Sequence, residues 1–189
     1  MRQLIKEFVD IVSRTLPIIE PIYEFGSLQV SGQEGFADLR PYFKKKKYIG
    51  CDMIPGPGVD RILDCHNIAL SEETAGTVLA MDTLEHVEFV RQAISEFSRI
   101  LKLGGIVVIS SHMNFPIHNY PNDYWRFTPE GFKSILRGFA LSFGDSVGDQ
   151  KFPHTVVGIG CSTTISNDIL QRFVDEERMW KQRWDATWP

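Results

Sequence analysis

The sequence predicts an α/β fold in which a doubly wound, mostly parallel sheet carries helices on both faces. Five short apolar runs rich in Ile, Val and Leu are predicted to be buried strands, at residues 21–25, 48–51, 59–63, 77–81 and 106–110. Continuous apolar runs of this kind are typical of parallel strands that are covered on both faces. Helical patterns alternate with these runs, and such alternation produces right-handed crossovers in a doubly wound sheet.

Two helices follow from local signals within the core. The segment 86–102 has one buried stripe at three- and four-residue steps, formed by Val87, Val90, Ile94, Phe97 and Leu101. Gly104 and Gly105 are expected to end this helix. A second helix should begin after Thr128, which suits an N-cap position, because Pro129 suits the first helical position.

The remaining segments complete a single predicted domain over residues 1–189. Residues 1–16 should form an amphipathic helix, and residues 166–184 a charged one. The runs FALSF and HTVVGI between them could form a closing hairpin. The chain length is enough for one domain, with its core at 21–160.

Composition excludes several classes of protein. Hydrophobic residues make up 43% of the chain and charged residues 23%, which is typical of a soluble globular protein. The net charge of −4 argues against general nucleic-acid binding. Charges interrupt the apolar positions at the N-terminus, so neither a signal peptide nor a membrane span is expected there. The three cysteines form no C-x-x-C pair, which fits a reducing cytoplasm. The oligomeric state does not follow from these features.

Polar residues follow the predicted strands at the point where each strand ends. Gly26 and Ser27 follow the first strand, Asp52 the second, Asp64 the third and Asp82 the fourth, and Ser111 and His112 follow the fifth. The carboxyl ends of parallel strands meet at one edge of a sheet, where α/β proteins bind their ligands. The sequence therefore predicts a ligand crevice at this edge.

The two acids after the second and third strands suit a nucleoside. Asp52 could accept hydrogen bonds from both ribose hydroxyls, and Asp64 from an exocyclic adenine amine. The alternative for each is a turn or capping aspartate. A dinucleotide pyrophosphate would need G-x-G-x-x-G, whereas this chain has Leu28 and Val30 after Gly26. A ligand without phosphates makes fewer demands on this loop.

The segments EFGS, YIGCDMIPGPGVD, LDCHNI, VLAMDTLEHV and ILKLGGIVVIS together resemble the class I S-adenosylmethionine-dependent methyltransferases. Within that superfamily the chain is similar to the small bacterial type 11 group, from about Tyr23 to Thr155. MDTLEHV and KLGGIVVIS are the most specific segments, and PIHNYPNDYWRFTPEGF matches a recurrent loop. The resemblance implies a seven-stranded sheet whose one antiparallel strand would be HTVVGI.

The resemblance also implies which residues bind the cofactor. Glu24 and Gly26 match the acid and glycine of the family's first motif, and Asp52 matches its ribose-binding acid. Asp64 matches the adenine-binding acid, and Asp82 lies where the methionine part would be. The full expected set is Glu24, Gly26, Ser27, Asp52, Met53, Asp64, Cys65 and Asp82. The family has two further glycines where this chain has Leu28 and Val30, so Ser27, Ser31 and Gly32 are expected to make the close approach.

The reaction expected is transfer of a methyl group from S-adenosylmethionine to a small-molecule or glycan-type acceptor. Such a displacement needs an aligned acceptor and, for a hydroxyl or amine, a base. His86 and His112 are the catalytic candidates, and the alternatives are a packed helix residue and a loop residue. His118, Tyr124 and Arg126, in the loop 115–127, are the candidates for acceptor binding, although Arg126 could instead brace the loop.

The sequence also bears on metal binding and on two alternative functions. The spacing of His112 and His118 matches no recognised metal motif, so no metal is expected. A catalytically weak methyltransferase-like binding protein is the main alternative function, because the glycine motif is altered. A nicotinamide-dependent oxidoreductase is a weaker alternative, because G-x-G-x-x-G is missing.

Overall fold

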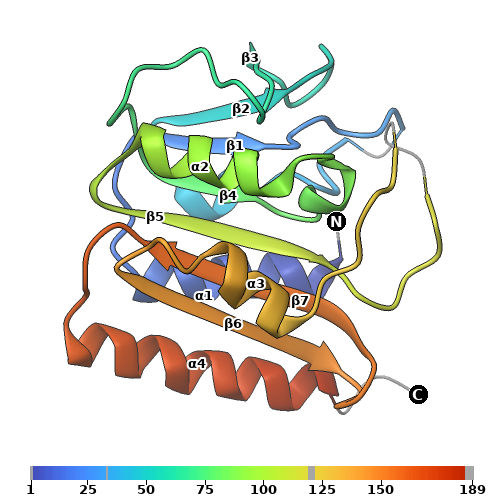
Figure 1. Ribbon diagram of the computed structural model, residues 1–189, viewed down its shortest axis with the longest axis vertical. Coiled ribbons are helices and arrows are strands. Elements are labelled where there is room, and N and C mark those ends of the chain that lie inside the picture. Colours follow the sequence, from blue (N-terminus) through green and yellow to red (C-terminus); the bar gives the residue numbers. More distant parts are fainter. Residues whose placement is uncertain (1, 33, 119–121, 186–189) are drawn as a thin grey trace.

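The chain forms one twisted sheet of seven strands, with helices on both faces (Figure 1). The structure is a computed structural model that describes residues 2–32, 34–118 and 122–185. The strands are β1 (Ile22–Phe25), β2 (Tyr48–Asp52), β3 (Arg61–Ile62), β4 (Ala75–Ala80), β5 (Leu101–His112), β6 (Leu141–Gly148) and β7 (Pro153–Cys161). Their order in the sheet is β3-β2-β1-β4-β5-β7-β6.

The direction of the strands confirms the predicted fold class. β1 pairs in parallel with β2 and β4, β2 with β3, and β4 with β5. β7 is antiparallel to both of its neighbours, β5 and β6. The HTVVGI run therefore lies in the reversed strand, as the resemblance implied.

Helices cover the two faces of the sheet in pairs. They are α1 (Gln3–Thr15), α2 (Val90–Ile100), α3 (Pro129–Ile135) and α4 (Asn167–Asp185), with short 3-10 helices η1 (Arg40–Phe43) and η2 (Leu84–His86). The apolar faces of α2 and α3 belong to one core cluster, and those of α1 and α4 belong to the other. None of the helices in the described part of the chain has the length and apolar content that a membrane crossing requires.

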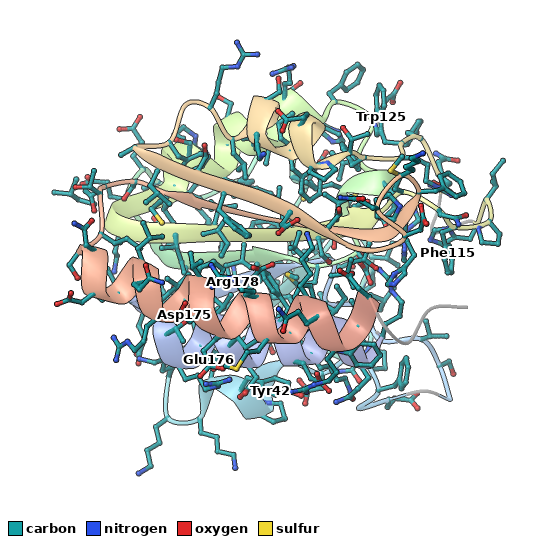
Figure 2. The ribbon with its side chains drawn as sticks, turned by 90° about the horizontal axis from the view of Figure 1, so that it is seen from below. Tyr42, Phe115, Trp125, Asp175, Glu176 and Arg178 are labelled. Atoms are coloured by element: carbon teal, nitrogen blue, oxygen red, sulfur yellow. The ribbon has the colours of Figure 1, made fainter. Side chains whose placement is uncertain are left out.

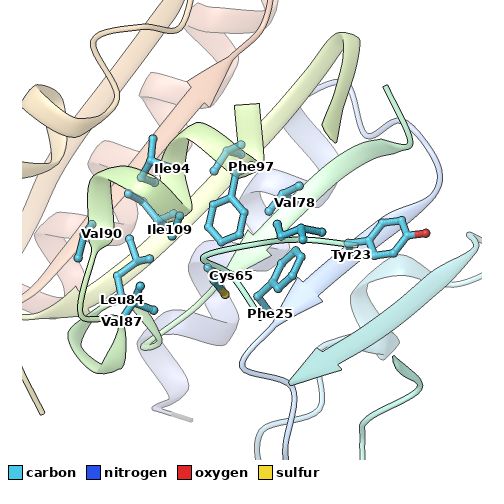
Figure 3. Packing of buried hydrophobic residues seen from close by; sticks show 14 of the residues in the cluster. Tyr23, Phe25, Cys65, Val78, Leu84, Val87, Val90, Ile94, Phe97 and Ile109 are labelled. Carbon is cyan, nitrogen blue, oxygen red and sulfur yellow. The ribbon is translucent and has the colours of Figure 1, made fainter. Parts of the chain in front are cut away.

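Alternation along the strands supplies both cores. In β1, Tyr23 and Phe25 point into the cluster under α2, and Ile22 points to the opposite face. The rings of Phe25 and Phe97 lie 4.9 Å apart at the centre of the first cluster (Figure 3). This packing fixes the end of β1, from which the loop beginning at Gly26 departs.

The two terminal helices pack on each other beneath the sheet. The indole of Trp180 in α4 lies 5.1 Å from the ring of Phe8 in α1, and its Nε1 donates to the carbonyl of Leu4 at 2.9 Å. α4 presents Asp175 and Arg178 to solvent, whereas its Glu176 pairs with Arg14 of α1 (Figure 2). Residues predicted as separate terminal helices therefore form one covering layer.

Some predicted boundaries were wrong. The helix expected at 86–102 begins at Val90, because Leu84–His86 forms a 3-10 turn, and ends at Ile100. Gly104 and Gly105 do not end it, because they lie inside β5 where the ladder with β4 is irregular. The strand expected at 59–63 is reduced to two paired residues at the sheet edge. Thr128 does cap α3, since its Oγ1 accepts from the Gly131 amide at 3.0 Å.

Candidate functional site

The carboxyl ends of β1, β2 and β4 lie side by side, because β1 is the middle strand of the three. Gly26 and Ser27, Asp52, and Asp82 follow or end these strands. The sheet order thus brings together the residues that the sequence placed at strand ends. Their contacts differ, and each is described in turn.

The side chain of Thr83 lies so close to residue 26 that only glycine fits there. Gly26 has a φ of +79°, a conformation that L residues rarely adopt, and a Cβ added there would lie 2.3 Å from Thr83 Oγ1. The Thr83 hydroxyl is hydrogen-bonded to the carbonyls of Phe25 and Met81, at 3.1 and 3.0 Å. Gly26 therefore lets the loop after β4 close on the end of β1.

The loop after Gly26 rests on the segment that follows β2. The Ser27 hydroxyl donates to Cys51 O at 3.1 Å, and the Gln29 amide donates to Pro57 O at 2.9 Å. The Leu28 side chain packs so closely against Gly56 that a Cβ there would lie 2.5 Å from it. Val30 is exposed. The two side chains that replace glycines are thus directed at a neighbouring turn and at solvent.

Asp52 and Asp64 both receive hydrogen bonds from the protein. The Leu28 and Ile54 amides each donate to Asp52 at 3.2 Å. The amide of His66 donates to Asp64 at 2.8 Å, and its ring Nδ1 lies at the same distance. A carboxylate has about four acceptor positions, so each side chain keeps capacity for a ligand. Beside them, Cys65 is buried and Met53 is exposed.

Glu24 occupies a different environment from the two aspartates. It is buried within β1, and its Oε2 accepts from the Tyr48 hydroxyl at 2.8 Å. Burial raises the pKa of Glu24 to about 7, against the opposing effect of the Tyr48 hydrogen bond. This contact holds β1 to β2, so Glu24 supports the crevice from within the sheet.

Glu24 should make the protein less stable as pH rises. The pKa of Glu24 is about 7 in the folded state, above the ordinary 4.5. Its contribution to the free energy of unfolding is therefore fully present below pH 4.5 and is lost as pH rises through 7. The loss should approach about 3 kcal/mol. Glu24→Gln keeps an acceptor for Tyr48 and should flatten the fall, measured by denaturant unfolding across this range. Tyr48→Phe should steepen the fall in stability, because it removes the hydrogen bond that lowers the pKa of Glu24. An unchanged pH dependence of stability in Glu24→Gln would show that Glu24 does not cause the fall.

Asp82 is held by groups from distant parts of the chain. Its φ is +48°, and its Oδ1 accepts from Ser110 Oγ at 2.9 Å and from Arg2 Nη2 at 3.1 Å. Arg2 also donates to Thr155. Burial raises the pKa of Asp82, but the positive charge of Arg2 and the Ser110 hydrogen bond outweigh burial and lower it overall. The start of the chain thus covers the end of β4.

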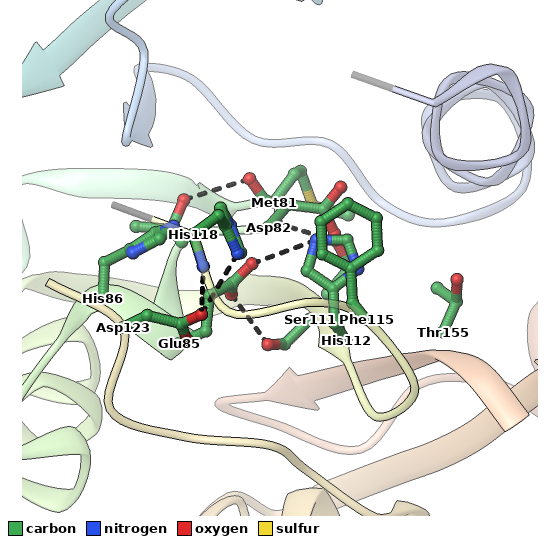
Figure 4. Close-up of polar contacts among 12 residues, drawn as sticks. Met81, Asp82, Glu85, His86, Ser111, His112, Phe115, His118, Asp123 and Thr155 are labelled. Atoms are coloured by element: carbon green, nitrogen blue, oxygen red, sulfur yellow. Dashed lines mark hydrogen bonds and ion pairs between the residues drawn. The ribbon is translucent and has the colours of Figure 1, made fainter. Parts of the chain in front are cut away.

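Three histidines from three segments gather next to Asp82. We call His86, His112 and His118, with Glu85, the histidine cluster (Figure 4). The rings of His86 and His118 are 4.8 Å apart, and those of His112 and His118 are 5.7 Å apart. η2 supplies the first histidine, the end of β5 the second and the following loop the third. The fold thus brings both catalytic candidates and one acceptor candidate together.

Burial favours the neutral form of two of these histidines, His112 and His86. Burial lowers the pKa of His112 to about 4, against the opposing charge of Asp82. Burial also lowers the pKa of His86, whose Nδ1 lies 2.6 Å from the Asn122 carbonyl. A neutral imidazole can accept a proton or bind a metal ion.

Sequence reasoning missed Glu85. Its side chain is fully buried, and Oε2 accepts from Ser111 Oγ at 2.7 Å. Oε1 lies 3.3 Å from His112 Nε2 but has no hydrogen-bond partner. Burial, followed by the charge of Asp82, raises the pKa of Glu85 to about 8. The signal available was its position between Asp82 and His86, directly after a buried strand.

Described residues of the loop that follows β5, together with Phe152, line a pocket beside this cluster. The pocket holds about 380 Å³ and is lined by Phe115, Asp123, Tyr124, Trp125, Arg126 and Phe152, among others. Residues 119–121 of the loop lie outside the described residues. Phe115 stacks on His112 at 4.2 Å and so joins the pocket to the histidine cluster. Figure 2 shows Phe115 and Trp125 at the same end of the molecule.

Arg126 is engaged within the loop itself. Its guanidinium binds both carboxylate oxygens of Asp123 and donates to the carbonyls of Phe115 and Pro116. The Arg126 hydrogen bonds hold the pKa of Asp123 well below its ordinary value. Tyr124 donates its amide to the Glu85 carbonyl at 2.8 Å. These contacts favour the bracing alternative for Arg126, whose contact with an acceptor stays a prediction.

The comparisons with known proteins find a methyltransferase match in part of the chain and a shared fold. Residues 38–109 match the family model described as Methyltransf_11, a methyltransferase domain. No curated protein matches the sequence. The other matches of this chain are to solved structures.

Three solved structures illustrate this likeness. A Haloferax volcanii methyltransferase in complex with the Trm112 methyltransferase activator is 15% identical, with a TM-score of 0.62 over 86% of this chain and 90% of that chain. An S-adenosylmethionine-dependent methyltransferase from Thermotoga maritima is 18% identical, with a TM-score of 0.57 over 85% and 89%. The Burkholderia thailandensis 1,6-didemethyltoxoflavin-N1-methyltransferase, with bound S-adenosylhomocysteine, is 13% identical, with a TM-score of 0.61 over 85% and 78%.

At these identities the structural likeness establishes the fold, and the family model adds a match to a methyltransferase domain over part of the chain. The model covers the segment from η1 through most of β5, which contains Asp52, Asp64 and Asp82. Over this segment the chain matches a methyltransferase domain, and its fold is like that of solved S-adenosylmethionine-dependent methyltransferases.

Proposed function

We propose that this protein methylates a small-molecule or glycan-type acceptor that binds in the pocket formed by the loop after β5. One observation carries the proposal. The 380 Å³ pocket shares Phe115 and Asp123 with the surroundings of the histidine cluster, at the carboxyl end of β5. An acceptor in this pocket would lie at the edge of the sheet where α/β proteins bind ligands.

The strand-end residues fit the expected cofactor. In this proposal Asp52 accepts hydrogen bonds from the ribose hydroxyls and Asp64 from the adenine amine, using acceptor capacity that their protein contacts leave. Leu28 fits because its side chain is directed at Gly56. When bound, S-adenosylmethionine would supply an electrophilic sulfonium methyl group.

The acceptor side of the proposal rests on the histidine cluster. A hydroxyl or amine acceptor loses a proton during methyl transfer, and a nearby neutral imidazole can take it. His86 and His112 are the proposed bases, and burial lowers the pKa of both. Tyr124 and His118 would contact the acceptor. The aromatic lining of the pocket suits a ring or the apolar face of a sugar.

The test combines binding with turnover. Calorimetry should show that S-adenosylhomocysteine binds and that NAD does not. A homocysteine-release assay should then identify acceptors from a panel of phenols, amines and sugars. Binding of S-adenosylhomocysteine without turnover on any acceptor would favour the methyltransferase-like binding protein. Binding of NAD alone would overturn the proposal in favour of the oxidoreductase.

Arg126→Ala should raise the acceptor KM and leave S-adenosylhomocysteine affinity within about twofold. It should also lower the melting temperature by about 5 °C, because the loop loses its hydrogen bonds to Asp123 and to two carbonyls. The matched control is Arg178→Ala, which removes an exposed arginine on α4. If turnover falls only in proportion to the folded fraction, Arg126 is a brace and makes no acceptor contact.

A further inference from the structure

We propose that Glu85, His112 and His118 form a binding site for a divalent transition-metal ion of the zinc class. One ligating atom from each residue lies within 4.8 Å of the other two, and Glu85 and His112 are buried. This inference does not depend on the proposed function, because metal binding requires neither the cofactor nor an acceptor. It revises the expectation, drawn from the spacing of His112 and His118, that no metal is bound.

The donor set is one that transition metals favour. Two imidazoles and one carboxylate bind zinc in sites that keep an open position, and the same set binds non-haem iron. Hard ions such as Mg²⁺ and Ca²⁺ prefer oxygen ligands. The chemistry of these three side chains therefore selects an ion such as Zn²⁺.

Two of the ligands already have the spacing of a metal site. Glu85 Oε1 and His112 Nε2 are 3.3 Å apart. Ligands about 2.0–2.1 Å from a tetrahedral zinc ion lie roughly 3.3 Å from each other. Glu85 is held by η2 and His112 by β5, so the packed parts of the fold fix this pair.

Glu85 Oε1 points to a missing partner. The atom is buried and accepts no hydrogen bond, although its neighbour Oε2 accepts from Ser111. An unsatisfied buried carboxylate oxygen is costly. A cation between Glu85 and His112 would satisfy this oxygen.

The surroundings resemble those that orient metal ligands. Metal-bound histidines commonly donate their second ring nitrogen to a carboxylate. Asp123 Oδ2 lies 3.1 Å from His118 Nδ1, and Arg126 holds Asp123 in place. The Ser111 hydroxyl donates to Glu85 Oε2 and so orients this carboxyl group. His118 lies on the loop, so a small loop movement would bring it from within 4.8 Å to ligand distance.

The experiment uses the full chain without a polyhistidine tag, stripped of metal with a chelator. Zn²⁺ should bind with one equivalent by calorimetry, and Co²⁺ should give the visible absorption of a tetrahedral N/O site. His118→Ala and Glu85→Gln should each weaken Zn²⁺ binding at least tenfold and change the Co²⁺ spectrum. His66→Ala is the matched control, because His66 also pairs with a carboxylate, that of Asp64, outside the cluster. It should bind Zn²⁺ within about twofold of the unsubstituted protein.

Three results would overturn the site. They are no stoichiometric Zn²⁺ binding, Zn²⁺ affinity unchanged in a folded His118→Ala protein, or equal loss in His66→Ala. Should Glu85→Gln fail to fold, His118→Ala decides the matter, since its side chain lies on the loop and is partly exposed. Failure here would leave the methyl-transfer assay unaffected, so the two proposals fail separately.

Discussion

Replacing Asp52 by Ala should weaken S-adenosylhomocysteine binding at least tenfold. In the proposed complex this carboxylate accepts from two ribose hydroxyls, and a hydrogen bond with a charged partner contributes about 1.5–3 kcal/mol. Each 1.4 kcal/mol is a factor of ten in affinity. Calorimetry on the folded variant measures the change directly.

Asp52 also has a structural role that the experiment must separate. It accepts from the Leu28 and Ile54 amides, so its loss frees two loop amides as well as the ligand contact. The melting temperature should be measured beside the affinity. Asp175→Ala, at an exposed position of α4, controls for loss of one negative charge. Unchanged affinity in a folded Asp52→Ala protein would remove Asp52 from the cofactor site.

Gly26→Ala should lower the free energy of unfolding by about 3 kcal/mol. About 1 kcal/mol of this comes from the positive φ, and the rest from a Cβ placed 2.3 Å from Thr83 Oγ1. Gly32 provides the matched control, since its φ is also +79° and nothing lies within 4 Å of an added Cβ. Gly32→Ala should therefore cost only about 1 kcal/mol. Denaturant unfolding of both variants gives the difference.

The clash can be tested independently of the backbone strain. Thr83→Ala removes the Oγ1 and Cγ2 atoms that lie closest to the added Cβ. Gly26→Ala combined with Thr83→Ala should then cost less than the sum of the two single changes. Equal costs for Gly26→Ala and Gly32→Ala would show that Thr83 does not select glycine at position 26.

The two proposals share His112 and His118. If His112 binds a metal ion, His86 becomes the proposed base, because it lies outside the set Glu85, His112 and His118. An open coordination position could then bind an oxygen or nitrogen of the acceptor and favour its deprotonated form. Faster turnover of the Zn²⁺-loaded protein than of the metal-free protein would connect the metal site with methyl transfer.

Local patterns in the sequence were sufficient to predict most of the strands and helices, though not all of their boundaries. The apolar runs of β1 and β4 are buried throughout, as is β5 from Gly105 onward, and such strands can be recognised without tertiary information. The Thr128 cap is equally local, because the hydroxyl and the amide it binds are three residues apart. The acids at strand ends could be placed at one edge because parallel strands all end on the same side.

Tertiary contacts decided what these residues do. Glu24 was grouped with the cofactor residues, yet its partner is Tyr48, 24 positions away. No sequence pattern identifies Glu85 as a site residue. Its role depends on burial against Ser111 and His112 of β5, which only the fold brings next to η2. The hydrogen bonds from Arg126 to the Phe115 and Pro116 carbonyls form because the loop folds back on itself, which the sequence does not show. Burial and the pairing of distant segments set the charge and hydrogen-bonding state of a side chain, and both exist only once the sheet has brought its strands together.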